Sequence, residues 1–212
     1  MEVNRRNFLL LSAGFRTMMD VMRLNSNEQD SSLLIIDTHI HLFDPTRPQG
    51  VPWPTQGDEI LYQPALPQRY RNVTHRLGVS GAIAIEASPW PQDNQWLLET
   101  AAKDTVIIGV VGNLEPGKPD FQREFEKLRR DPLFLGIRYG NLWNRNLGEQ
   151  ISNPKFISDL KSLAEAGLCL DTADPDVSLI SDVVRLTDKV PNLRVIIDHL
   201  PQINVPKGKQ IR

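Results

Sequence analysis

The sequence Leu33-Leu34-Ile35-Ile36-Asp37-Thr38-His39-Ile40-His41 joins an aliphatic run to a His-x-His pair. A nearly continuous apolar run is typical of a strand buried on both faces, as in a parallel sheet. Because alternate side chains of a strand share a face, Asp37, His39 and His41 would point the same way. Two imidazoles at this spacing can reach one ion, with each nitrogen about 2.0–2.1 Å from zinc. The alternative is one packed and one solvated histidine, but the strand context favours a metal-binding or catalytic pair.

The rest of the chain repeats a strand followed by a helix. Further apolar runs lie at 81–86, 105–111, 134–138, 168–171 and 193–198. The segments between them that are predicted to be helical lie at 66–77, 93–103, 120–130, 154–166 and 176–189. This alternation predicts an α/β fold with a parallel sheet and right-handed crossovers. Two architectures fit, a (β/α)8 barrel of the TIM type and an open doubly wound sheet.

Polar residues at the strand ends favour the barrel. In a barrel the active site lies at the carboxyl ends of the strands. No glycine-rich nucleotide-binding sequence follows any strand, which weakens the doubly wound alternative. The polar residues at these ends are His39, His41, Glu86, Asn113, Arg138, Asp171, Asp198 and His199.

The number of strand–helix units is smaller than a whole barrel requires. A complete barrel takes about 250 residues and eight units. This chain has 212 residues, its last clear strand is the sixth, and its ending at 204–212 is polar. We therefore expect residues 33–212 to form an incomplete TIM-type barrel with about six of the eight units, truncated before its last two strands.

Residues 1–32 are predicted to lie outside this domain as an N-terminal tail. The sequence Asn4-Arg5-Arg6-Asn7-Phe8-Leu9 resembles a twin-arginine export signal, and the apolar segment after it ends at Arg16. Export signals carry an apolar region of about 7–15 residues. The polar stretch 25–32 fits an unstructured tail equally well. The expected location is the cytoplasm, or the periplasm if the signal operates.

Composition excludes several classes of function. The formal net charge is −2 without a basic block, which argues against nucleic-acid binding by phosphate neutralisation. No stretch approaches the roughly 20 apolar residues of a membrane span. The single cysteine, Cys169, excludes an intrachain disulfide and a cysteine-rich zinc site, and we expect it to be a small buried hydrophobe. The proline-rich segment 43–67 is predicted to be an ordered lid.

Three motifs resemble a known family. Residues 35–44, Ile-Ile-Asp-Thr-His-Ile-His-Leu-Phe-Asp, resemble the opening strand of the amidohydrolase-2 branch of the amidohydrolase superfamily, and the Phe-Asp pair is similar to its lactonase-like members. Gly136-Ile137-Arg138 resembles the fourth-strand Gly-x-Arg of that group, and residues 197–200 resemble its later Asp-His segment. The resemblance implies a distorted barrel with one divalent metal, often zinc, that hydrolyses sugar lactones or pyrone dicarboxylate lactones. Some lactonase members work without a metal, so a metal-free mechanism stays open.

The resemblance also implies the metal ligands. His39 and His41 would bind the ion from the first strand, and His199 would be a third ligand or a group that polarises the substrate. The family's general base, an aspartate after the eighth strand, has no match in this chain. A bound divalent ion would lower the pKa of water to about 7. The carboxylates that could then accept its proton are Glu86 and Asp198.

Each of these carboxylates also has another interpretation. Glu86 could ligate the metal or pair with a helix N-terminus or an arginine, and Asp198 could orient a histidine by accepting its second N–H. Arg138 has the planar fork that binds carboxylates, so a small acidic or hydroxyl-rich substrate is expected, with Tyr139 beside it in the pocket wall.

The predicted function is therefore a metal-dependent hydrolase that opens a lactone or a related amide. Two alternatives stay open, a metal-dependent decarboxylase of the same superfamily and an inactive barrel fragment. Association into a homo-oligomer also stays open, as does a partner chain that completes the barrel.

Overall fold

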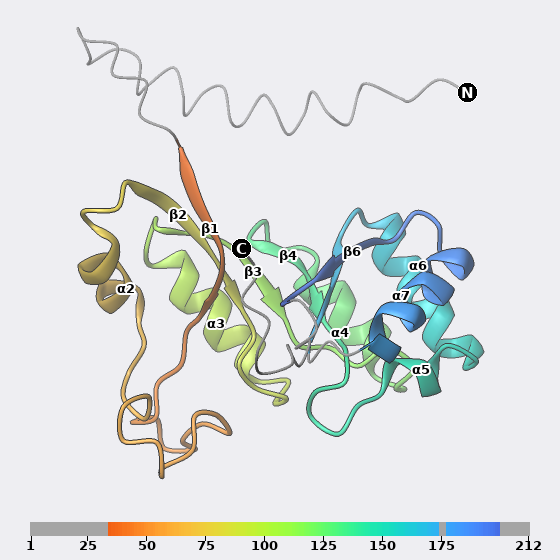
Figure 1. Ribbon diagram of the computed structural model, residues 1–212, viewed down its shortest axis with the longest axis horizontal. Coiled ribbons are helices and arrows are strands. Elements are labelled where there is room, and N and C mark those ends of the chain that lie inside the picture. Colours follow the sequence, from red (N-terminus) through yellow and green to blue (C-terminus); the bar gives the residue numbers. More distant parts are fainter. Residues whose placement is uncertain (1–33, 174–176, 200–212) are drawn as a thin grey trace, which may run out of the picture. The chain divides into compact units, whose positions relative to one another are not determined.

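The computed structural model describes residues 34–173 and 177–199 (Figure 1). The chain divides into two compact units, Met1–Leu33 and Leu34–Arg212, and the description below concerns the second. The twin-arginine segment and the polar ending lie outside the described residues, so both stay predictions. No helix in the described part of the chain is long and apolar enough to cross a membrane.

The described residues form a parallel sheet whose strands follow one another in chain order. The strands are β1 (Ile35–His41), β2 (Val79–Ile85), β3 (Ile107–Gly112), β4 (Phe134–Arg138), β5 (Cys169–Thr172) and β6 (Arg194–Ile197). The helices are α2 (Pro67–Thr74), α3 (Asp93–Ala102), α4 (Phe121–Leu128), α5 (Leu147–Gln150), α6 (Pro154–Glu165) and α7 (Val177–Lys189). Each strand pairs with the next in parallel, in the order β1-β2-β3-β4-β5-β6 (Figure 1). This order confirms the barrel-type fold, because a doubly wound sheet reverses its strand order at a switch point.

Local sequence fixes the helix boundaries, as α6 illustrates. The side chain of Asn153 caps the helix by accepting hydrogen bonds from the backbone N–H groups of Lys155 and Phe156, at 3.0 and 3.4 Å. Pro154 occupies the first turn, where no N–H is needed. Beyond the helix, Gly167 has φ of 72°, a left-handed conformation that glycine adopts without strain.

The core lies between the sheet and the helices. The rings of Phe121 and Phe125 in α4 stack at 5.5 Å, and Phe156, Leu160 and Leu163 of α6 are fully buried. Full burial of such side chains stabilises a fold by about 1.5–3 kcal/mol each.

Glycine allows β4 and β5 to approach closely. A Cβ atom at Gly136 would lie 2.2 Å from the carbonyl oxygen of Cys169. Cys169 itself is buried, as predicted, and burial raises the pKa of its thiol to about 11.

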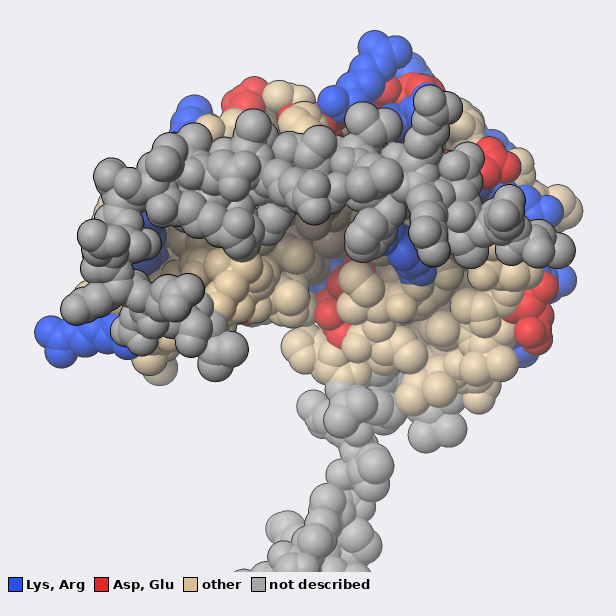
Figure 2. Space-filling model, turned by 90° about the horizontal axis from the view of Figure 1, so that it is seen from above, with Lys and Arg blue, Asp and Glu red and all other residues tan. Residues whose placement is uncertain are grey.

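Several apolar side chains of the sheet remain exposed. Ile108 of β3 and both Ile196 and Ile197 of β6 are more than two-fifths exposed. Within residues 34–173 and 177–199, β1 and β6 each have a strand neighbour on one side only. Residues other than Lys, Arg, Asp and Glu make up most of the described surface on the face seen in Figure 2.

The proline-rich segment, residues 43–67, is ordered as predicted. Phe43 and Ala65 exchange two backbone hydrogen bonds, of 3.2 and 2.9 Å, which close its ends. Arg47 bonds Asp93 of α3 at 2.9 Å and lies over the ring of Trp96 at 4.5 Å. This lid segment is therefore attached to the start of α3.

Candidate active site

The His-x-His pair lies at the carboxyl end of β1, where its two imidazoles face each other. Nε2 of His39 and Nε2 of His41 are 3.3 Å apart. Nδ1 of His41 lies 3.0 Å from the carbonyl oxygen of Ile85 in β2, and Nδ1 of His39 lies 3.0 Å from Oδ2 of Asp198. Each Nδ1 faces an oxygen acceptor, so the neutral imidazoles carry their proton on Nδ1 and keep a lone pair on Nε2.

This pair of nitrogens fits a divalent cation. Two lone pairs that face each other at 3.3 Å repel unless a proton or a cation lies between them. Two nitrogens that each bind a tetrahedral zinc at about 2.0–2.1 Å are about 3.3 Å from each other. Burial lowers the pKa of His41 to about 4, so its imidazole is neutral at physiological pH, as a ligand must be.

His199 lies beside this pair. It is exposed, its φ is 59°, and its ring centroid is 5.0 Å from that of His39. The structure thus brings the three predicted ligands together. His39 and His41 form a facing pair, and His199 lies next to His39. In the part of the chain that the structure describes, no group of three or more His, Cys, Asp or Glu side chains is arranged to hold a metal ion.

A buried charge cluster supports the histidines. Arg138 donates from Nη2 to Oδ2 of Asp198 at 3.0 Å, and its Nε lies 3.2 Å from Oδ1 of Asp171. Burial, with the hydrogen bond to Asp198, raises the pKa of Asp171 to about 9. Burial alone would raise the pKa of Asp198, but hydrogen bonds from His39 and Asp171 outweigh it and hold that pKa below its ordinary value. At neutral pH Asp171 is therefore protonated and Asp198 ionised.

This cluster gives Arg138 a structural role and adds Asp171 to the residues of the site. Arg138 is 5% exposed and its fork faces two carboxylates of the protein, so the structure shows it organising the site. Its contact with a substrate stays a prediction. From the sequence, Asp171 was expected at a strand end but was given no role. The signal that could have revealed its role is the pairing of Arg138 with Asp171 in adjacent strands, which places their side chains side by side.

Glu86 lies at the end of β2 with both carboxylate oxygens already bonded. Oε2 accepts a hydrogen bond from the backbone N–H of Ser88 at 2.8 Å. Oε1 accepts one from the indole Nε1 of Trp143 at 3.3 Å. Burial raises the pKa of Glu86. The structure therefore places Glu86 near the strand ends, but in contact with protein donors.

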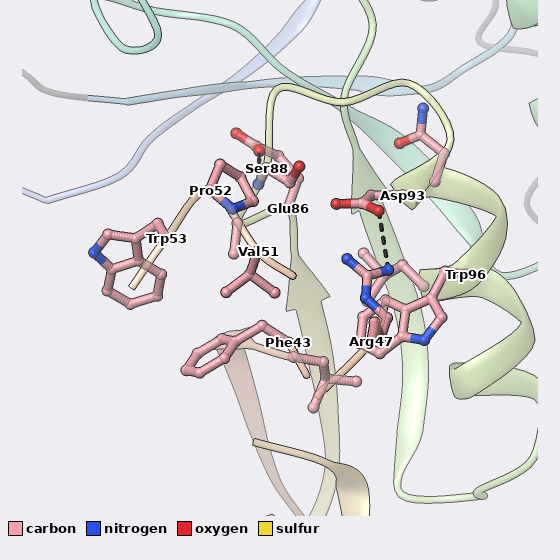
Figure 3. Close-up of a pocket in the computed structure, with 13 residues that line it drawn as sticks. Phe43, Arg47, Val51, Pro52, Trp53, Glu86, Ser88, Asp93 and Trp96 are labelled. Carbon is pink, nitrogen blue, oxygen red and sulfur yellow. Dashed lines mark hydrogen bonds and ion pairs between the residues drawn. The ribbon is translucent and has the colours of Figure 1, made fainter. Parts of the chain in front are cut away.

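A small pocket lies between the lid segment and α3, with Glu86 in its wall. Trp53 of the lid segment and the Arg47–Asp93 ion pair beside Trp96 line other sides of this pocket (Figure 3). Trp53 also touches the site, because its ring centroid is 5.5 Å from that of His41. The lid segment thus forms one wall of the site.

Tyr139 is not brought to the site. It is 3% exposed, its ring lies 5.2 Å from that of Phe156 in α6, and burial raises its pKa to about 12. Because it directly follows Arg138, which faces the site, strand alternation turns Tyr139 towards the helices. The structure places it in the core and not in the pocket wall, where the sequence predicted it.

Asp37 makes one hydrogen bond next to the site and one to helix α2. Its carboxylate accepts hydrogen bonds from the backbone N–H of His39 at 3.2 Å and from the hydroxyl of Tyr70 in α2 at 3.0 Å. Asp37 therefore ties β1 to α2 and orients no imidazole.

Comparisons with known proteins agree with this architecture. The family model described as amidohydrolase matches residues 36–211. The chain is 26% identical over 179 residues to L-fucono-1,5-lactonase of Burkholderia ambifaria, which covers 82% of this chain and 59% of that protein. The chain thus spans about three-fifths of the length of the curated relative that it matches.

Solved structures show the same fold. An amidohydrolase from Burkholderia multivorans with bound zinc superposes with a TM-score of 0.68 at 21% identity, over 79% of this chain and 58% of that one. A probable 2-pyrone-4,6-dicarboxylic acid hydrolase from Acinetobacter baumannii with bound citric acid gives 0.59 at 17% identity, over 79% and 58%.

Proposed function

The chain belongs to the amidohydrolase family, and from this premise we propose that it is a metal-dependent hydrolase that opens a lactone. The observation that carries the proposal is the pair of Nε2 atoms of His39 and His41, 3.3 Å apart with their lone pairs facing each other. The similarity to a curated L-fucono-1,5-lactonase supports a cyclic ester as the substrate. The zinc in the Burkholderia multivorans structure supports zinc as the ion.

In this proposal each residue of the site has a separate role. His39 and His41 would hold the ion, which when bound would polarise the lactone carbonyl and lower the pKa of water to about 7. Asp198 accepts the Nδ1–H of His39 at 3.0 Å, which fixes the imidazole and makes its Nε2 more basic. Hydrogen bonds from His39 and Asp171 keep Asp198 ionised, and Arg138, bonded to it at 3.0 Å, adds to this effect. His199, exposed beside His39, is our candidate for accepting the proton of water.

The experiment that tests the proposal measures zinc content by elemental analysis after incubation with zinc and desalting. We expect about one ion per chain in the wild type and none in the double variant H39A/H41A, because both donors are lost. His75→Ala is the matched control, since His75 is an exposed histidine after α2 that bonds the carbonyl oxygen of Asn72. Equal zinc content in the wild type and the folded double variant would refute the metal site.

The reaction is tested separately with L-fucono-1,5-lactone as the probe. Ring opening releases an acid, so a pH indicator follows it directly. Acid release that is lost in H39A/H41A and kept in H75A would support the hydrolase. Release of carbon dioxide from an acidic probe, without lactone hydrolysis, would point to the decarboxylase instead.

A further inference from the structure

The loop that follows β4, residues 139–146, contains two consecutive residues in a left-handed conformation. Trp143 has φ of 60° and Asn144 has φ of 58°. For a bulky residue such as tryptophan a positive φ is a true outlier and a source of backbone strain. Such strain persists only where surrounding contacts determine the conformation. We call residues 139–146 the β4 loop.

The β4 loop is fixed to the ends of β5, β3 and β2. Asn141 donates its backbone N–H to the carbonyl oxygen of Ala173, after β5, at 3.0 Å. Arg145 donates from Nη2 to Oδ1 of Asn113, after β3, at 2.8 Å. Trp143 donates from its indole Nε1 to Oε1 of Glu86, at the end of β2, at 3.3 Å. The loop therefore crosses from β4 over β3 to β2, along the edge where the histidines lie. Its strained residue, Trp143, is the one that bonds Glu86.

Glu86 is suited to hold this loop. It is 4% exposed, and its other oxygen, Oε2, is fixed by the backbone N–H of Ser88 at 2.8 Å. Its Oε1 is thereby held as the acceptor for the indole N–H of Trp143.

From these contacts we propose that Glu86 is a positioning residue that acts through Trp143. It holds the β4 loop in its strained conformation and so sets the wall that this loop forms at the strand ends beside the histidines. Glu86 then neither binds the metal nor accepts the proton of water, which are the roles suggested by its place at a strand end. The inference deepens the proposed function, because the wall matters to catalysis only if this site turns over a lactone.

The first test needs no activity and uses a double-mutant cycle read by tryptophan fluorescence. Glu86→Ala removes the acceptor, so the emission of the folded protein should shift as Trp143 leaves its fixed position. The same substitution made in a Trp143→Phe background should leave the emission unchanged. Trp90→Phe is the control background, in which Glu86→Ala should still produce the shift. A shift that persists without Trp143 would overturn the proposal.

The second test separates the roles by kinetics and metal content. With L-fucono-1,5-lactone as the probe, Glu86→Ala and Trp143→Phe should each raise KM by about the same factor and leave zinc content unchanged. The double variant should be no worse than either one, because coupled residues are not additive. Glu86→Gln keeps an amide oxygen for one of the two donors, so its KM should lie between those of the wild type and Glu86→Ala, with kcat within about threefold.

Two results would contradict this role. A fall in kcat of about 10²–10⁴ in Glu86→Gln, with Trp143→Phe unaffected, would make Glu86 the proton acceptor. Loss of zinc in Glu86→Gln would make it a ligand. A wild type that binds zinc but does not open the lactone refutes the proposed function alone, and the fluorescence cycle then still decides the role of Glu86.

Discussion

Removal of the cation at Arg138 should destabilise the protein strongly. Arg138 is 5% exposed and lies within 3.2 Å of both Asp171 and Asp198. Asp171 is protonated at neutral pH, since its pKa is raised to about 9 mainly by burial. Arg138→Met therefore leaves one buried negative charge, on Asp198, with His39 and the protonated Asp171 as its remaining partners. Breaking a buried ion pair in this way costs about 3–5 kcal/mol.

Thermal unfolding followed by circular dichroism measures this loss. For a chain of about 150–250 residues, each kcal/mol lowers the unfolding temperature by about 2–4 °C, so we expect a fall of roughly 6–20 °C. The matched control is Arg123→Met in α4. That arginine pairs with Glu124, but its side chain is 66% exposed, and the unfolding temperature should stay where it is.

A second substitution tests the cause of the loss. Asp198→Asn in the Arg138→Met background removes the isolated charge and should recover part of the lost stability. If Arg138→Met unfolds at the wild-type temperature, or if the second change lowers stability further, the buried ion-pair argument fails.

Three more predictions concern the rest of the fold. Gly136→Ala places a Cβ atom 2.2 Å from the carbonyl oxygen of Cys169 and should cost about 3 kcal/mol in urea unfolding, whereas Gly57→Ala, with open space around it, should cost far less. Cys169 is buried and its pKa is raised to about 11, so iodoacetamide at pH 8 should label it slowly in the native protein and rapidly in urea; equal rates would contradict its burial. Asn153→Ala removes the cap of α6 and should cost about 1 kcal/mol in the same unfolding assay, with no change expected if the cap is not formed.

The sheet was predictable because its signals are local. The apolar runs at 81–86 and 134–138 correspond to β2 (Val79–Ile85) and β4 (Phe134–Arg138). The short helix α5 (Leu147–Gln150) was not predicted, because one helical turn is too short for a periodic apolar pattern. Its one signal is Asn146, whose side chain accepts a hydrogen bond from the N–H of Glu149 at 3.1 Å.

The site was predictable only where its geometry is set within one strand. His39 and His41 are two residues apart, so strand alternation alone brings them together. The partners of Glu86 and Arg138 are distant in sequence, since Trp143 is 57 residues after Glu86 and Asp198 is 60 residues after Arg138. No local pattern carries such contacts, and for that reason the sequence suggested a chemical role for Glu86 where the structure shows a hydrogen bond to a tryptophan.

The outer side of β6, which has no strand partner among residues 34–173 and 177–199, has a consequence for handling the protein in solution. Within the described residues, β6 pairs with β5 only, and both Ile196 and Ile197 are exposed. An unpaired strand edge with apolar side chains is a template for edge-to-edge pairing between molecules. Turbidity should therefore rise steeply with protein concentration, and Ile196→Lys should shift the solubility limit upwards by placing a charge on that edge.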